Sequence, residues 1–443
     1  MNYGICVAVV GAAWAGAALA VPAVSNVRMV QSAVGGVVSV NYDLSDGPAV
    51  VTFDVKTNGV SIGGQHLARA MGDVNRVVSG PSGSFTFYPC ERSQDGLSAC
   101  IGMEDAVAEV TAWPLSSPPD YMVVDLSLTN SATVCPVSYY PCAEQVPGGV
   151  GHPAYKTSRL LMRKIPAAGV QWRMGSPQGE VGRKLNDENP KRETPHYVTL
   201  TSDYYMGVYE VTQGQYGLFA HDCTQPGVSD SQGQPDSAMR PLDNVSYAVF
   251  RGAWDKVWPT NGHDVPDYCP IAKLRLRSGL QFDLPTDAQW EFACRAGTGT
   301  ALYSGTELDP HDYNTSPEWG GGISDNLDEL GWYEQNARGR TQIVGKKRPN
   351  AFGLYDMLGN VAEVCLDVAA VSDGTESGWP YAVSVTDPGD KPAGSIGSSR
   401  IVRGGSYQES CQFCRSAVRM SCTYNEASVR RGFRLMCPAL VPD

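Results

Sequence analysis

The alternation of apolar and polar residues predicts a strand-rich first part of the chain. Two alternating segments, Val37–Leu44 and Ala49–Thr57, are separated by the turn sequence Asp46-Gly47-Pro48. Three more short segments continue the series, at Ser84–Pro89, Val107–Leu115 and Tyr121–Leu128. Short strands with turn signals and no long helical period predict a small β-sandwich-like accessory domain over residues 21–130.

Two helices are predicted in the second part. Thr212 and Thr286 are each followed three residues later by a glutamine, which is the pattern of a capping box at a helix start. After Thr286 the helix can end at Gly297. Trp290 falls on the apolar face of this helix, so we expect it in the core.

The remaining pattern divides the chain into domains. Residues 131–158 are rich in Pro, Gly and Ser and are predicted to be a linker, followed by a second domain over residues 159–438. Arg163–Ser176 and His196–Thr212 are strand-like, whereas Gly- and Asn-rich loops dominate beyond Ala296. A last short strand is expected in Arg400–Tyr407.

The N-terminus has the pattern of a secretory signal peptide over residues 1–20. An apolar stretch, Ile5–Leu19, ends in Ala18-Leu19-Ala20, which matches a cleavage site. A membrane anchor is the alternative, but Gly11 and Gly16 interrupt the stretch and it is short for a span. We therefore expect an extracytoplasmic protein, periplasmic or secreted, with no membrane span after signal cleavage.

Composition limits the class of binding partner and indicates the redox state of the compartment. The net charge of −12 argues against nucleic acid as a partner, and 48 Gly and 30 Pro predict a turn-rich chain. Of 13 Cys, Cys6 would leave with the signal, and an even number in an exported chain predicts disulfides. Cys90 with Cys100, and Cys135 with Cys142, are close enough in sequence to close small loops.

Four segments occur in an order that identifies a family. They are Glu210–Phe219, Phe282–Thr298, Arg348–Val364 (RPNAFGLYDMLGNVAEV) and Arg400–Arg434 (RIVRGGSY, CRSAVR and RGFR). Their succession resembles the formylglycine-generating enzyme, or sulfatase-modifying factor, family. The resemblance implies a C-type-lectin-like domain with little regular secondary structure, so the predicted fold class is α+β, with the β-sandwich-like domain preceding it.

The resemblance also implies bound calcium. The family positions correspond here to the side chains of Asp356 and Glu363 and the backbone carbonyls of Gly359 and Val361. A hard cation requires several oxygens from a sharply turned loop, and Gly359-Asn360 permits that turn. The alternative is that the two carboxylates only cap and solvate a turn.

The family reaction is the oxidation of a peptide cysteine to formylglycine by dioxygen at a copper(I) bis-thiolate. The family implies substrate contacts at Ser406 and Arg419, although an arginine between apolar residues is commonly a buried structural ion pair. The sequence departs from the family at the cysteines. Gln408 and Glu409 stand where the first family cysteine would be, and counting back from Arg419 puts Cys411 at the position of the second, with Cys414 as an additional cysteine.

Two interpretations of Cys411 and Cys414 remain open. They are a respaced metal or redox pair, which would be the catalytic residues with copper as cofactor, or they form structural disulfides with Cys294, Cys422 or Cys437. Two further departures are Ala362, where the family has tryptophan, and Arg430, where it has asparagine.

The sequence therefore leaves two functions. One is an exported copper-dependent oxidoreductase of the sulfatase-modifying-factor type, acting on a cysteine of a protein partner such as a sulfatase. The other is a non-catalytic, calcium-stabilised module that binds a peptide or a glycan on the lectin-like scaffold. Six His without an HxxxH or HxH pair, and no P-loop or GxSxG motif, give no support to other chemistries.

Overall fold

A computed structural model describes most of the chain. The described residues are 21–32, 37–67, 70–92, 98–100, 105–127, 134–183, 193–229, 231, 233–252, 265–309, 322–369, 385–387 and 399–439. The signal peptide predicted over residues 1–20 lies outside them.

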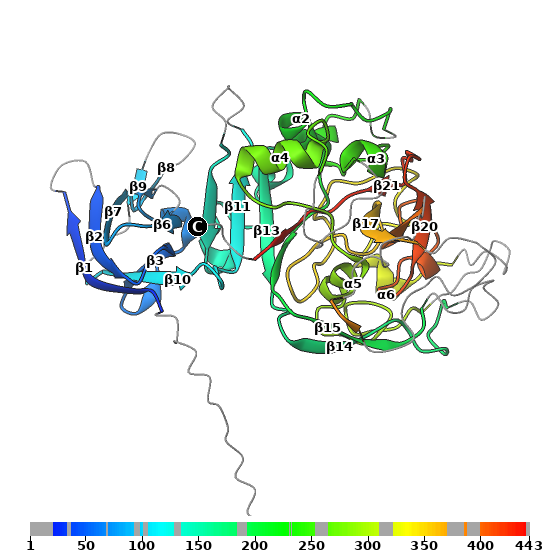
Figure 1. The fold of residues 1–443 in the computed structure, drawn as a ribbon, viewed down its shortest axis with the longest axis horizontal. Helices are drawn as coiled ribbons and strands as arrows, with labels where there is room; N and C mark the ends of the chain where they lie inside the picture. The colour runs from blue at the N-terminus through cyan, green and yellow to red at the C-terminus, as the bar shows by residue number, and fades with distance from the viewer. Residues whose placement is uncertain are drawn as a thin grey trace, which may run out of the picture.

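The N-terminal part consists of small antiparallel sheets (Figure 1). One sheet has the order β1-β2-β7-β5, and in another β10 and β6 flank β3, which also pairs with β4. Buried side chains of both sheets, such as Val40, Phe53 and Phe85, form one core cluster. The elements are β1 (Ala23–Gln31), β2 (Val38–Ser45), β3 (Ala49–Thr57), β4 (Val60–Ser61), α1 (Gly64–Leu67), β5 (Met71–Gly72), β6 (Arg76–Val78), β7 (Ser82–Phe87), β8 (Cys90–Arg92), β9 (Ser98–Cys100) and β10 (Val107–Pro114).

The C-terminal part is a mixed, strand-rich fold with short helices (Figure 1). Its sheets have the orders β12-β11-β13-β16-β22, β14-β15-β18 and β20-β19-β17-β21. The strands are β11 (Tyr121–Asp125), β12 (Val137–Tyr140), β13 (Arg159–Ile165), β14 (Val170–Met174), β15 (His196–Leu200), β16 (Tyr204–Gly207), β17 (Ala362–Val368), β18 (Val385–Thr386), β19 (Ser399–Arg403), β20 (Met420–Thr423), β21 (Arg431–Gly432) and β22 (Met436–Pro438). The helices are α2 (Gln213–Phe219), α3 (Tyr247–Phe250), α4 (Pro270–Ser278), α5 (Asp287–Arg295) and α6 (Asp325–Asp328).

The strand pairing corrects the predicted domain boundary. β11 was assigned to the N-terminal domain, but it pairs with β12 and with β13 in the sheet of the second domain. The predicted linker over residues 131–158 contains β12 and therefore contributes a strand to that sheet. The continuous apolar sequence of β11 identifies a buried strand but not its partner, because strand pairing depends on distant segments.

Both predicted capping boxes are present. The hydroxyl of Thr212 accepts from the amide of Gln215 at the start of α2, and Thr286 does the same with Gln289 at α5. Helix α5 ends at Arg295, and both Ala296 (φ 46°) and Gly297 (φ 94°) take positive φ values directly after it. Trp290 is fully buried, as the apolar face predicted.

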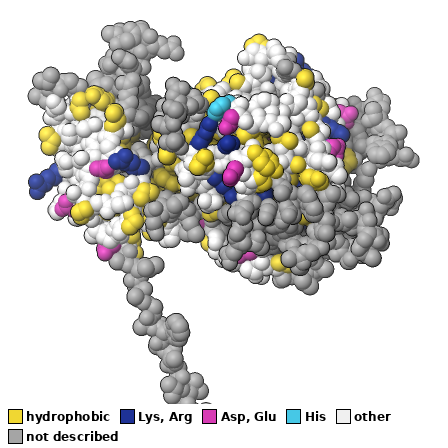
Figure 2. All heavy atoms as spheres, turned by 45° about the horizontal axis from the view of Figure 1, so that its top comes forward, with side chains coloured by type: hydrophobic (Ala, Val, Ile, Leu, Met, Phe, Trp, Pro, Cys, Tyr) yellow, Lys and Arg dark blue, Asp and Glu magenta, His cyan; other side chains and the backbone are white. Residues whose placement is uncertain are grey.

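The surface carries hydrophobic side chains on both parts of the molecule, among polar atoms, on the face shown in Figure 2. Leu276 and Val60 are examples of exposed apolar side chains, one from each part. Among the helices of the described residues, none has the length and hydrophobicity that a membrane crossing requires.

None of the cysteines whose side chains the structure describes forms a disulfide. Cys135 and Cys142 are free thiols, and so are all the other cysteines of the described side chains: Cys223, Cys269, Cys294, Cys365, Cys411, Cys414, Cys422 and Cys437. The predicted bonds from Cys411 or Cys414 to Cys294, Cys422 or Cys437 are therefore not formed. Cys90 and Cys100 are direct cross-strand partners of the β8–β9 backbone ladder, so the disulfide predicted for them stays a prediction.

We predict that mass mapping of the oxidised protein finds one linked pair, Cys90–Cys100. Directly opposed residues of an antiparallel pair lie about 4.5–5.5 Å apart between Cα atoms, which is within the range that a disulfide spans. Cys411 and Cys414 should be alkylated as free thiols after unfolding without reductant. A disulfide from Cys411 or Cys414 to any other cysteine would contradict the prediction.

Candidate functional site

Buried ion pairs hold the loops of the second domain around helix α5. Arg403 of β19 is fully buried and donates to Asp287 and to Glu291, with 2.8 Å between its Nη2 and Glu291 Oε2. Arg419 donates to the other oxygen of Asp287 at 2.8 Å. Two carboxylates of one helix thus fix two arginines from the C-terminal region.

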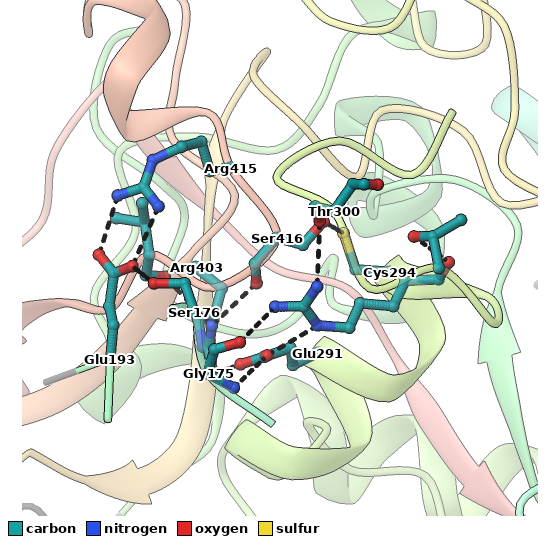
Figure 3. Close-up of polar contacts among 12 residues, drawn as sticks. Gly175, Ser176, Glu193, Glu291, Cys294, Thr300, Arg403, Arg415 and Ser416 are labelled. Atoms are coloured by element: carbon teal, nitrogen blue, oxygen red, sulfur yellow. Dashed lines mark hydrogen bonds and ion pairs between the residues drawn. The ribbon is translucent and has the colours of Figure 1, made fainter. Parts of the chain in front are cut away.

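The same cluster reaches the segment around β14. Glu291 accepts from the amide of Gly175 at 2.8 Å, and Arg295 donates to the carbonyls of Gly175 and Thr300. Arg415 pairs with Glu193 at 2.9 Å, and Ser416 lies within 3.6 Å of the Cys294 sulfur. Figure 3 shows how these side chains converge from loops that are distant in sequence.

Arg419 therefore has a structural ion-pair partner, as its apolar neighbours predicted. Its side chain is 3% exposed and its Nε donates to Asp287. Ser406 is fully buried, and its hydroxyl accepts from the amide of Gln408 at 3.3 Å. The substrate contacts implied for Ser406 and Arg419 stay predictions.

The segment from Asn350 to Asn360 is a tightly turned loop that needs its glycine. Gly359 has φ 84°, and a Cβ there would lie 2.1 Å from the carbonyl oxygen of Trp332. The fully buried Glu210 accepts from the Asn360 side chain at 2.7 Å and from the Val361 amide at 3.0 Å. Burial, together with the negative charges of Asp356 and Glu363, raises the pKa of Glu210 well above its usual value.

The predicted calcium ligands differ in how well they fit a cation. Asp356 accepts from the Gly345 amide through Oδ2, whereas its buried Oδ1 has no hydrogen-bond partner within the described part of the chain. Burial raises the Asp356 pKa to about 6. An open carboxylate oxygen fits a hard cation.

The Glu363 carboxylate instead forms an ion pair with an arginine. Its carboxylate accepts from Arg434 at 2.7 to 3.0 Å and from the indole of Trp290 at 2.6 Å. The described residues include no group of three or more His, Cys, Asp or Glu placed to hold a metal ion. Of the two predicted carboxylate ligands, Asp356 therefore presents an unsatisfied oxygen and Glu363 does not, and the calcium set of Asp356, Gly359, Val361 and Glu363 stays a prediction.

The two candidate catalytic cysteines are buried thiols. Cys411 is 1% exposed and Cys414 is 0% exposed, and both belong to the core cluster around α5. Burial raises the pKa of Cys411 and raises that of Cys414 well above its usual value. A Cβ at Gly405 would lie 2.6 Å from the Cys414 sulfur, so this thiol packs under the Gly404-Gly405 turn.

The three departures from the family pattern meet in one cavity. Ala362, Glu409 and Arg430 come from three separate segments, and all three line a space of about 160 Å³. The other lining residues are Val402, Met420, Ser421, Glu426 and Arg431. The sequence marked each departure separately but carried no signal that they share a cavity.

Neighbouring strands form the floor of this cavity. Val402 of β19 pairs with Met420 of β20, and Ala362 of β17 pairs with Arg431 of β21. These four strands are adjacent in the order β20-β19-β17-β21. A small residue at position 362 leaves open the space above β17 that a tryptophan would fill.

Glu409 is the carboxylate of the cavity wall. Burial raises its pKa, and hydrogen bonds with Ser406 lower it. Its Oε1 lies 3.9 Å from Arg430 Nη1, too far for a hydrogen bond, and its Oε2 is buried without a hydrogen-bond partner among the residues described. The arrangement can bind a charged group but places no thiol at this position.

Comparison with known proteins identifies the family. Residues 171–439 match the model of the sulfatase-modifying factor enzyme 1-like domain. This match covers more than half of the chain, which therefore belongs to that family and is a sulfatase-modifying-factor-like protein.

Curated relatives agree with this assignment. The chain is 27% identical over 246 residues to the chaperone protein LppX of Paenibacillus barcinonensis, covering 46% of this chain and 80% of the relative. It is 28% identical over 205 residues to the formylglycine-generating enzyme of Mus musculus, covering 45% of this chain and 46% of that enzyme. The identity to the formylglycine-generating enzyme of Streptomyces coelicolor is 35% over 156 residues, covering 34% of this chain and 45% of that enzyme. The chain thus spans less than half the length of these two enzymes.

Two solved structures are similar to part of the chain. Treponema denticola variable protein 1 is 26% identical, with a TM-score of 0.40, covering 63% of this chain and 95% of that one. PvdO from Pseudomonas aeruginosa is 21% identical, with a TM-score of 0.42, covering 63% and 94%.

Removing one buried arginine should destabilise the fold strongly. We expect Arg434→Met to lower the free energy of unfolding by about 3–5 kcal/mol, because it leaves the Glu363 carboxylate buried without its cation. The control Arg348→Met breaks an exposed pair with Glu329 and should cost less than about 1 kcal/mol. Urea unfolding measures both, and equal losses would contradict the account. Adding Glu363→Met to Arg434→Met should restore part of the loss.

Acid should weaken the cluster around Glu291. Burial alone would raise the pKa of this carboxyl, but Arg295, Arg403 and Arg419 outweigh burial and hold it at about 2, below the ordinary 4.5. A lowered folded-state pKa stabilises the fold above pH 4.5 and loses that contribution as the pH falls towards 2. The contribution is about 3 kcal/mol.

The variant Glu291→Gln isolates this effect. Its free energy of unfolding should differ most from that of the wild type above pH 4.5, and the difference should shrink as the pH falls to about 2. Denaturant unfolding at a series of pH values measures the difference. A difference that stays constant across this range would exclude the proposed role of the Glu291 charge.

Proposed function

We propose that the second domain is a ligand-binding module that keeps the family scaffold without the family's oxidation chemistry. The observation that carries this proposal is the cavity of Ala362, Glu409 and Arg430. Gln408 and Glu409 stand where the first family cysteine would be, so the family's thiolate pair is incomplete there. The relative named as a chaperone is consistent with family members that have other activities.

Copper-dependent oxidation is the second candidate. Copper(I) prefers soft thiolate ligands, and Cys411 and Cys414 are close in sequence. Their burial favours the protonated thiols, which are poorer ligands. The geometry of the described residues therefore favours binding over oxidation.

The proposal also covers the localisation of the protein, the role of its N-terminal domain, its cofactor and its partner. The protein is exported by its N-terminal signal, and the preceding strand-rich domain is a β-sandwich that provides spacing or attachment. The second domain is a lectin-like scaffold, with calcium bound at Asp356. Its partner is a peptide, a protein such as a sulfatase, or a glycan. The open Oδ1 of Asp356 supports the calcium ligand.

A copper and turnover assay tests this function. The reduced full-length protein should produce no formylglycine from a cysteine peptide supplied with copper(I) and dioxygen. Its copper(I) stoichiometry should not change in Cys411→Ser or Cys414→Ser, because these thiols are packed in the core. The Streptomyces coelicolor enzyme, assayed in parallel, is the positive control. Stoichiometric copper lost in Cys411→Ser, together with peptide oxidation, would establish the oxidase instead.

A further inference from the structure

Two pairs of oppositely charged side chains line the cavity described above. The two pairs differ in the distance between their charged groups. Glu426 and Arg431 are 2.6 Å apart, and Glu426 also accepts from the Thr423 hydroxyl at 2.9 Å. This pair is satisfied within the protein. Glu409 and Arg430, in contrast, face each other at 3.9 Å.

The loose pair leaves hydrogen-bonding capacity open. Glu409 Oε2 is buried and has no partner in the part of the chain that the structure describes, which is an unfavourable state for a carboxylate oxygen. The Arg430 side chain is 50% exposed, against 17% for Glu409. The anionic side chain therefore lies deeper, and the cationic side chain lies nearer to solvent.

The size of the cavity limits the ligand. A cavity of about 150 Å³ admits a benzene-sized molecule, so a space of about 160 Å³ holds one side-chain-sized group. Apolar side chains of Ala362, Val402 and Met420 line part of it and can contact a short methylene chain.

On these observations we propose that the cavity binds a small zwitterion. Its ammonium or guanidinium group pairs with Glu409, and its carboxylate pairs with Arg430, so two charge-assisted hydrogen bonds replace one loose contact. A free basic amino acid and a peptide ending in a basic residue with a free carboxylate share this chemistry. The inference rests on the proposed binding function and specifies the ligand class of that site.

Calorimetric titration of the full-length protein tests the ligand class. L-lysine and 6-aminohexanoate carry both charges, whereas pentylamine and hexanoate each carry one. We expect the single-charge compounds to bind at least about tenfold more weakly, since each lost charge-assisted bond is worth about that factor. Gly-Gly-Lys and its C-terminal amide separate a peptide terminus from a free amino acid. Binding of Gly-Gly-Lys but not of its amide assigns the terminus, and binding of L-lysine alone assigns the amino acid.

Variants assign each charge to its partner. In Glu409→Gln, 6-aminohexanoate should lose its advantage over hexanoate, and in Arg430→Gln it should lose its advantage over pentylamine. Ala362→Trp fills the cavity and should abolish binding of every compound. The matched controls Glu329→Gln and Arg348→Gln change an exposed ion pair elsewhere in the domain and should leave binding unchanged.

Three results would overturn the zwitterion proposal. They are no binding of L-lysine or 6-aminohexanoate at about 10 mM, equal affinity for the single-charge compounds, or unchanged binding in both charge variants. None of these results would affect the binding-module proposal, which fails only if copper-dependent oxidation is observed. The two proposals can therefore fail separately.

Discussion

Arg403 lies fully buried between Asp287 and Glu291, and Arg419 binds the same helix start. A domain with so little regular structure cannot rely on backbone ladders alone to fix its loops. Buried ion pairs are costly to desolvate, and they stabilise a fold only when the geometry satisfies their hydrogen bonds. Here helix α5 presents two carboxylates, and strands and loops from the C-terminal region attach to them through arginines. Glu291 and Arg403 of this cluster are drawn in Figure 3.

This constraint explains how the strands and loops that line the cavity keep their positions. Arg403 fixes β19, which carries Val402 into the cavity floor. Arg434 fixes Glu363, the neighbour of Ala362 on β17. The charge clusters therefore hold the positions that flank the cavity, while the cavity residues themselves are free to differ from the family pattern.

Local signals made the helices and many strands predictable. The capping boxes at Thr212 and Thr286 rest on contacts three residues apart, so the sequence is sufficient to find them. β11 was placed in the wrong domain because its partner, β13, is separated from it by a long connecting segment. A strand's own apolar residues predict that it is buried and not which sheet it joins.

The site likewise has features that the sequence predicted and features that depend on contacts between distant segments. The sequence identified the family, the burial of Arg419, and the individual departures at Ala362, Glu409 and Arg430. Their common cavity depends on how β17, the loop after β19 and β21 come together, which no local pattern encodes. The role of Glu210 beneath the Asn360 turn was missed for the same reason, since its partners lie 150 residues away.

A crystal structure of the full-length protein with 6-aminohexanoate tests the central claim most directly. The account predicts ligand density in the cavity, with the ammonium within hydrogen-bonding distance of the Glu409 carboxylate and the carboxylate at Arg430. The thiols of Cys411 and Cys414 should remain buried and without metal in crystals grown with copper(I). An empty cavity together with a copper ion bridging these two thiols would contradict it.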